Sequence, residues 1–132
     1  MPDATELRCT GCPEAFPIRE SAPRFSTDDT DTAQYFGYIW GLHTQTVTPP
    51  REPVPYHLRV MYESLGAPAL KGLILDGGCG DGVDLANVAL DPDSHVVGVE
   101  LSSGGVATSL SRTKGMARAN VIQGDLLRIP LA

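Results

Sequence analysis

Three short apolar runs of the sequence each end in an acidic residue. The three acids are Asp76, Glu100 and Asp125. Apolar runs of this length are typical of buried parallel strands. Ligands of open parallel sheets bind at the carboxyl ends of the strands. We therefore expect the three acids to meet at one edge of a sheet, where they would form a ligand site.

The turn after Asp76 has glycine at alternate positions. Gly78, Gly80 and Gly82 follow a predicted strand and precede a predicted helix. Glycine adopts positive φ readily and lets a ligand approach the backbone where a Cβ atom would collide. Glu100 lies twenty residues beyond Gly80 and could accept hydrogen bonds from the vicinal hydroxyls of a ribose. This pattern indicates a nucleoside-type ligand.

The nearest alternative is a dinucleotide site, whose fingerprint is Gly-x-Gly-x-x-Gly. Starting from Gly78, that fingerprint requires glycine at position 83, which is Val83. The carboxylates of Asp76 and Asp81 would also repel a pyrophosphate, which needs bare amides at a helix N-terminus. S-adenosylmethionine has no phosphate and is cationic at its sulfonium and amino groups. Spacing and charge therefore favour S-adenosylmethionine over NAD.

Three consecutive stretches resemble the motifs of class I S-adenosylmethionine-dependent methyltransferases. They are residues 75–82, 97–102 and 120–130, in the family's order and spacing. Together they lie within roughly residues 70–131, the part of the chain that the resemblance covers. The resemblance implies an α/β fold with a Rossmann-like parallel sheet, of which this chain would hold the first three strands. It also implies S-adenosyl-L-methionine as the cofactor.

The resemblance implies a role for each strand-end residue. The expected cofactor-binding residues are Asp76, Gly78, Gly80, Gly82, Glu100, Leu101, Asp125 and Leu126. The glycine turn and Asp76 would hold the methionine part, Glu100 the ribose hydroxyls and Asp125 the adenine amino group. The two leucines would lie against the adenine faces. We assign no general base, because methyl transfer is an in-line displacement for which positioning supplies much of the rate.

The first 25 residues have a different character. Cys9-x-x-Cys12, followed by short apolar pairs with proline, favours a compact hairpin module. It resembles the zinc-ribbon-like module that precedes the catalytic domain in some bacterial methyltransferases. A structural zinc site needs four ligands, and neither His43 nor His57 forms a recognisable pair. We therefore predict a degenerate ribbon-like module over residues 1–25, without metal.

The remaining elements must position the strand ends. A helical arm with a Pro-rich linker is predicted for residues 26–70, and a partial cofactor-binding domain for residues 71–132. The predicted helices cover the aromatic run at 35–40 and residues 56–65, 83–90 and 102–114. Alternating strands and helices indicate a parallel sheet with right-handed crossovers. The aromatic side chains are typical of packing, although the resemblance implies that this arm can cover the cofactor.

Composition narrows the functional class. The chain carries 16 acidic and 10 basic side chains, a net charge of −6, and its arginines are scattered. Nucleic acid is bound through clustered Lys and Arg. The excess of acidic side chains and the scattered arginines therefore argue against nucleic acid as a partner. No apolar stretch approaches the roughly 20 residues that span a bilayer. The odd count of three cysteines favours a reducing cytoplasm over a disulfide framework.

These observations lead to one leading hypothesis. We expect the cofactor-binding portion of a methyltransferase whose acceptor is a small molecule, a lipid or a sugar, although ribosomal RNA methylation stays open. The family's domain has seven strands, so we expect this chain alone to lack activity. The open edge of the strand at residues 73–75 would invite aggregation or a partner chain that completes the sheet. The alternative is a non-catalytic nucleoside-binding or protein-interaction fragment of that fold.

Overall fold

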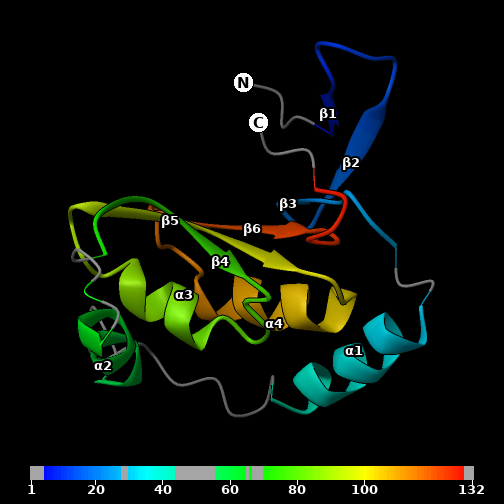
Figure 1. Ribbon diagram of the computed structural model, residues 1–132. Helices are drawn as coiled ribbons and strands as arrows, with labels where there is room; N and C mark the ends of the chain where they lie inside the picture. Colours follow the sequence, from blue (N-terminus) through cyan, green and yellow to red (C-terminus); the bar gives the residue numbers. More distant parts are fainter. Residues whose placement is uncertain (1–4, 28–29, 44–55, 65, 67–69, 130–132) are drawn as a thin grey trace.

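The computed structural model describes residues 5–27, 30–43, 56–64, 66 and 70–129. The larger of its two sheets is parallel and has the strand order β4-β5-β6 (Figure 1). Its strands are β4 (Gly72–Gly77), β5 (Ser94–Glu100) and β6 (Ala119–Gln123). These bounds contain the three apolar runs predicted as strands. The predicted α/β fold with a Rossmann-like parallel sheet is confirmed.

Two helices connect these strands and cover one face of the sheet. Helix α3 (Val83–Val88) links β4 to β5, and α4 (Ser103–Arg112) links β5 to β6; both lie below the sheet in Figure 1. Helix α4 begins after Ser102, whose side chain accepts a hydrogen bond from the Gly105 N–H, as an N-cap does. Both helices begin within one residue of the predicted start.

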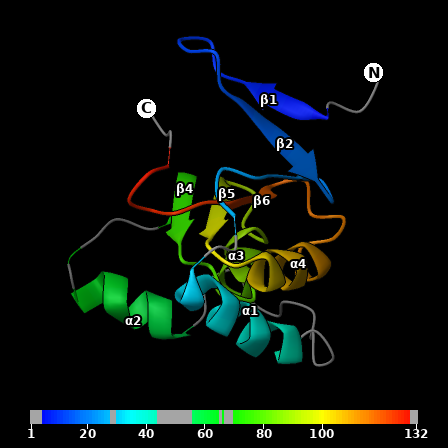
Figure 2. The same cartoon turned by 90° about the vertical axis from the view of Figure 1, so that its right-hand side faces the viewer.

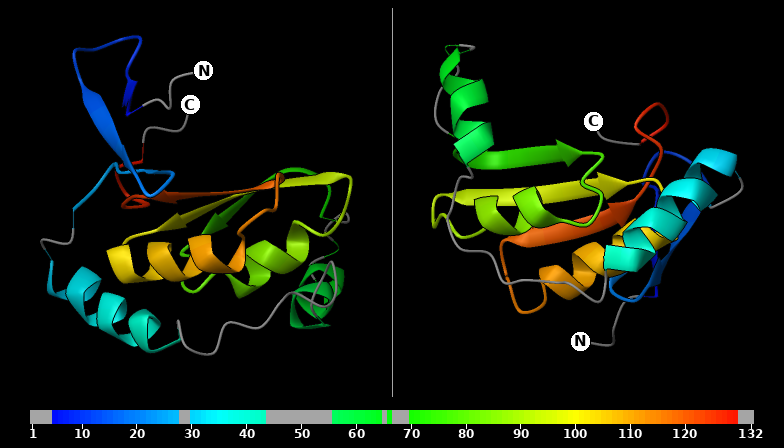
Figure 3. Two further views of the ribbon diagram at one scale, coloured as in Figure 1. Left: turned by 180° about the vertical axis from the view of Figure 1, so that it is seen from behind. Right: turned by 90° about the horizontal axis from the view of Figure 1, so that it is seen from below.

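Two further helices come from the arm between residues 26 and 70. Helix α1 (Asp31–His43) packs against α4, whereas α2 (Tyr56–Ser64) lies at the other end of the sheet (Figures 2 and 3). The predicted Pro-rich linker at residues 49–55 lies outside the described residues. None of the helices in the described part of the chain is long and apolar enough to cross a bilayer.

The core lies between the sheet and the α3–α4 layer. Its buried side chains include Leu85, Val96, Val106 and Val121. The opposite face of β4 is open, since Leu73 is 82% and Leu75 is 51% exposed. Among the described residues β4 pairs with β5 alone.

The front of the chain forms a small antiparallel sheet of β1 (Glu6–Arg8), β2 (Ala15–Arg19) and β3 (Ala22–Pro23). This agrees with the predicted hairpin character. Cys9 and Cys12 are exposed, and no group of three or more metal-ligating side chains lies among the described residues. The side chains of His43 and His57 lie outside the described part of the chain. The resemblance to a zinc ribbon stays a prediction.

The residues after β3 contact the edge strand β6 of the larger sheet. The sequence did not predict this contact. Arg24 forms a parallel bridge with Gln123 at the end of β6, and the Phe25 N–H donates to the Gln123 carbonyl over 2.8 Å. A single parallel bridge therefore joins the segment after β3 to the edge of β6. This junction holds the front sheet beside the strand ends that were predicted to bind ligand.

Candidate functional site

The glycine turn between β4 and α3 has the predicted left-handed backbone. Gly78, Gly80 and Gly82 have φ of 80°, 53° and 76°. The N–H groups of Gly78 and Cys79 both donate to the Val99 carbonyl, over 2.8 and 3.0 Å. A Cβ atom on Gly80 would lie 2.7 Å from the Trp40 ring. Glycine is therefore required here for conformation and for close packing.

Glu100 ends β5 and is buried, with 6% of its surface exposed. Its Oε2 accepts a hydrogen bond from the Gly80 N–H at 3.1 Å. Its Oε1 accepts from the Ser102 N–H at 2.8 Å and from the Ser102 hydroxyl at 2.7 Å. A carboxylate offers about four acceptor positions, so about one, on Oε2, is left for a ligand. Two simultaneous bonds to a ribose would require one of these internal bonds to break.

A hollow of about 280 Å³ lies at the ends of β5 and β6. Five of the eight predicted cofactor-binding residues line it, namely Gly78, Glu100, Leu101, Asp125 and Leu126. Two other predicted residues lie outside the lining. The Gly80 N–H donates a hydrogen bond to Glu100, which does line the hollow, and Gly82 is buried against Ser109. The structure thus brings most of the predicted residues around one space of mainly apolar character.

Helix α1 supplies the remaining wall of this hollow. Phe36 and Trp40 line it, and their rings are stacked with centroids 6.4 Å apart. Tyr35 and Tyr38 of the same helix are 62% and 67% exposed. The interpretation of these aromatics as packing is incomplete for Phe36 and Trp40, whose place at the hollow agrees with the alternative of an arm that covers the cofactor. Their spacing of four residues, which puts both on one helix face, is the signal that could have found them.

Asp76 does not line the hollow that Glu100 and Asp125 share. It lines a smaller hollow of about 70 Å³ between α2, α3 and β4, together with Asp84. Burial raises the pKa of Asp76 from 3.8 to about 6, and the nearby Asp84 carboxylate adds to the effect. Asp76 is in register with Gly98, two residues before Glu100, so both acids face the same side of the sheet. That Asp76 takes part in cofactor binding stays a prediction.

The raised pKa of Asp76 predicts a pH dependence of stability. The folded state holds this proton more tightly than the unfolded state, so the contribution is full below pH 3.8 and is lost as the pH rises through about 6. We expect Asp76→Asn to gain stability relative to the unsubstituted chain between about pH 4 and pH 7, measured by urea unfolding.

Asp93 provides the matched control for that measurement. The exposed Lys71 ammonium hydrogen-bonds to Asp93 and lowers its pKa. Its stabilising contribution is therefore lost as the pH falls, so Asp93→Asn should show the opposite trend. Equal pH profiles for Asp76→Asn and the unsubstituted chain would contradict the assignment.

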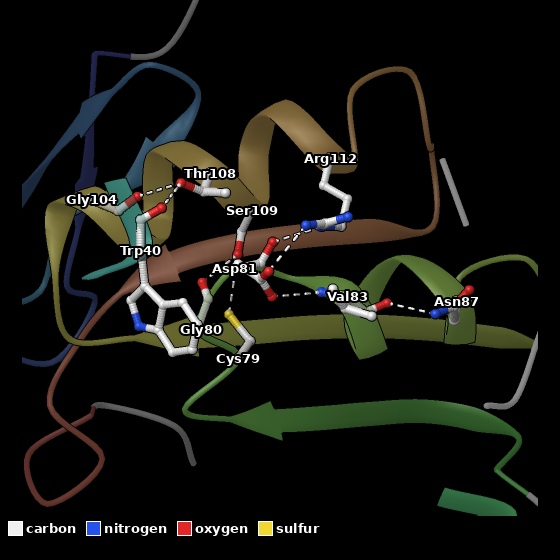
Figure 4. A network of polar contacts seen from close by, with 10 residues as sticks. All are labelled: Trp40, Cys79, Gly80, Asp81, Val83, Asn87, Gly104, Thr108, Ser109 and Arg112. Atoms are coloured by element: carbon white, nitrogen blue, oxygen red, sulfur yellow. Dashed lines mark hydrogen bonds and ion pairs between the residues drawn. The ribbon is translucent and has the colours of Figure 1, made fainter. Parts of the chain in front are cut away.

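Asp81 is neutralised within the protein. Its carboxylate pairs with the Arg112 guanidinium at 3.1 Å, and the Arg112 Nε–H donates to the Asp81 carbonyl at 2.9 Å (Figure 4). Only 6% of the Arg112 side chain is exposed. The interpretation that the charge of Asp81 selects a cationic ligand is therefore not supported. The pair instead fastens the glycine turn to the end of α4.

Cys79 is buried within this turn. Burial raises the pKa of its thiol to about 12, and its sulfur lies 3.7 Å from the Ser109 hydroxyl (Figure 4). Cys9 and Cys12 are exposed, and the hydrogen bond with Cys12 lowers the pKa of Cys9. The burial of Cys79 agrees with its interpretation as a small buried filler.

These surroundings predict the order in which the thiols react. We expect a thiol-specific disulfide reagent to modify Cys9 and Cys12 of the reduced native chain quickly, with Cys9 first. Cys79 should react only after unfolding in urea. Rapid modification of all three thiols in the native chain would contradict the burial of Cys79.

Comparison with known proteins identifies the fold. No sequence family and no curated protein matches this chain. Solved structures do match, among them the [4+2]-cyclase SpnF, with a TM-score of 0.55, 20% identity and coverage of 76% of this chain and 43% of that one. A second is geranyl diphosphate C-methyltransferase from Streptomyces coelicolor A3(2), with a TM-score of 0.52, 16% identity and coverage of 80% and 53%.

A third match is geranyl diphosphate methyltransferase in complex with GPP and sinefungin, with a TM-score of 0.52, 16% identity and coverage of 76% and 50%. These similarities show the Rossmann-like fold of class I methyltransferases. The chain spans about half the length of these three structures. The Streptomyces enzyme was solved with S-adenosyl-L-homocysteine bound, whereas SpnF is named for a cyclisation.

Proposed function

We propose that this chain carries the S-adenosylmethionine-binding portion of a methyltransferase for a small-molecule, lipid or sugar acceptor. The observation that carries the proposal is the convergence of Gly78, Glu100, Leu101, Asp125 and Leu126 on one hollow at the strand ends. Ligands of parallel α/β sheets bind at such strand ends. The fold, seen in structures with S-adenosylhomocysteine or sinefungin, supports the same ligand class.

The residues present fit the parts of this cofactor. Leu101 and Leu126 offer apolar surface for the adenine ring. Asp125 accepts one hydrogen bond from the Leu127 N–H at 2.9 Å and keeps acceptor positions for the adenine amino group. Glu100 keeps about one acceptor position for a ribose hydroxyl. The methionine part would lie towards the glycine turn at Gly78.

When bound, S-adenosylmethionine supplies an activated methyl carbon. The contribution of this chain to the reaction is to bind the cofactor, orient it and exclude water. Phe36 and Trp40 form an apolar wall on the α1 side of the hollow. We assign no acid or base in this chain to proton transfer.

The proposed acceptor class follows from charge and from the neighbours. The net charge of −6 opposes a polyanionic substrate. Two structural neighbours are named as methyltransferases of geranyl diphosphate, which is a small molecule. The odd number of cysteines leads us to propose the cytoplasm as the compartment.

Isothermal titration calorimetry with S-adenosylhomocysteine tests the proposal. We expect one binding site, and competition by sinefungin. A folded chain that gives no binding heat with either compound would overturn it. Enhancement of NADH fluorescence in a parallel titration would instead support the dinucleotide alternative.

A second candidate is a nucleoside-binding domain without methyl transfer. It is supported by the structural neighbour SpnF, which is named as a [4+2]-cyclase. Transfer of a labelled methyl group from S-adenosylmethionine to any small-molecule acceptor would exclude this candidate. Binding of S-adenosylhomocysteine without transfer to any acceptor would favour it.

A further inference from the structure

A second hollow, of about 560 Å³, lies between the front sheet and the end of β6. The residues that line it include Phe16, Glu20, Arg24, Ser26, Ser103 and Gln123. None of the residues that line it lines the hollow assigned above to the cofactor. It exists because the segment after β3 pairs with the end of β6.

Arg24 forms the polar side of this second hollow. Only 9% of its side chain is exposed. Its Nη1 donates to the Gln123 Oε1 at 3.1 Å, and its Nη2 donates to the Glu20 carboxylate at 3.2 Å. Its Nε is buried without a hydrogen-bond partner among the described residues. A buried guanidinium is costly unless its N–H groups are bonded, so this donor lacks the acceptor that it requires.

Ser26 repeats the same feature two residues along the chain. Its hydroxyl is also buried without a partner in the described part of the chain. Both residues line one hollow, so an anion bound there would lie beside both donors. Ser103, at the same hollow, is the first residue of α4, and a helix N-terminus carries partial positive charge.

The charge of the lining has the opposite sign to that of the whole chain. Two arginines, Arg19 and Arg24, line the hollow, and Glu20 is the only carboxylate among the lining residues. The chain as a whole, by contrast, has a net charge of −6. The apolar side of the hollow is formed by Phe16 and Phe25, whose ring centroids lie 4.6 Å apart. The lining therefore combines positive charge and unmet donors with an aromatic surface.

We propose that this hollow binds the carboxylate or phosphate group of a small molecule. The anion accepts hydrogen bonds from the Arg24 Nε–H and the Ser26 hydroxyl, and the apolar part of the ligand lies against Phe16 and Phe25. This site is distinct from the cofactor hollow and does not depend on the function proposed for it.

The test is an NMR titration of the ¹⁵N-labelled whole chain with phenyl phosphate, with benzoate and with uncharged benzamide. We expect one of the two anions to shift the Arg24 Nε–H signal and the Ser26 and Ser103 amides to saturation, with no shift by benzamide. The stronger binder shows whether the site takes phosphate or carboxylate. No saturable shift with either anion, or equal shifts with benzamide, would overturn the proposal.

Two substitutions sharpen this test without disturbing the Arg24 contacts to Gln123. Ser26→Ala should weaken the anion about ten-fold, because one hydrogen bond to a charged group is lost. Glu20→Gln should strengthen anion binding by roughly two-fold, because an exposed and largely screened opposing charge is removed. Unchanged anion affinity in both variants would contradict the site.

The cofactor hollow provides the control. Asp125→Ala should leave anion binding unchanged, and Ser26→Ala should leave S-adenosylhomocysteine binding unchanged. Loss of anion binding in Asp125→Ala would show that the anion occupies the cofactor hollow, which would overturn the proposal. The two ligands therefore report on the two sites separately.

Discussion

Gly104→Ala is expected to lower the free energy of unfolding by about 2–3 kcal/mol and to detach α1 from α4. A Cβ atom at position 104 would overlap the carbonyl oxygen of Gly37 in α1. Both groups belong to backbones, so neither can rotate away, and the helices must separate. Because Phe36 and Trp40 reach the hollow from α1, the same change should weaken S-adenosylhomocysteine binding.

Urea unfolding and Trp40 emission measure the two parts of this result. Trp40 is the single tryptophan of the chain, so a red shift in its emission reports exposure of this wall. Gly41→Ala is the matched control, since a Cβ atom there meets nothing within 4 Å; it should be neutral or stabilise by up to about 1 kcal/mol. Unchanged stability and unchanged emission in Gly104→Ala would contradict the packing of α1 on α4.

Glu100→Ala should reduce the free energy of unfolding by about 3–5 kcal/mol and abolish S-adenosylhomocysteine binding. The carboxylate accepts bonds from the Gly80 N–H and from both donors of Ser102. Without it, three buried donors lose their partner, each at a cost of about 1–3 kcal/mol before water and relaxation offset part of the loss. Glu100 thus joins the glycine turn to the start of α4.

Urea unfolding checks the stability change, and calorimetry at a temperature where the variant is folded checks binding. Glu63→Ala, at an exposed position of α2, is the control and should change stability by less than about 0.5 kcal/mol. The loss of unfolding free energy in Glu100→Gln should lie between the losses in Glu100→Ala and Glu63→Ala, because one acceptor oxygen and the side-chain volume are retained. A fully stable Glu100→Ala chain that binds the ligand normally would contradict both roles.

The sequence predicted the strand ends well because their signals are local. Apolar runs, glycine spacing and acidic residues identified β4, β5 and β6, and they identified Glu100 and Asp125 as neighbours in space. The capping residue Ser102 was likewise readable, since an N-cap depends on a few adjacent residues. These features depend on short stretches of chain and are set by backbone geometry.

The features that were missed depend on distant partners. Arg24 and Gln123 lie 99 residues apart, and Asp81 and Arg112 lie 31 residues apart; no local pattern joins either pair. Gly104 and Gly105 are unfavourable within a helix by intrinsic propensity. In the structure these glycines allow close approach of Gly37 and Trp40, so tertiary packing overrides helix propensity.

The most direct test of the cofactor site is an NMR titration of the labelled chain with S-adenosylhomocysteine. We expect saturable shifts at the amides of Gly78, Leu101, Asp125 and Leu126 and at the Trp40 indole, with Ser26 and the Arg24 Nε–H unaffected. The absence of any shift in the folded chain, or shifts confined to the hollow beside Arg24, would contradict a nucleoside-type cofactor site at the ends of β4, β5 and β6.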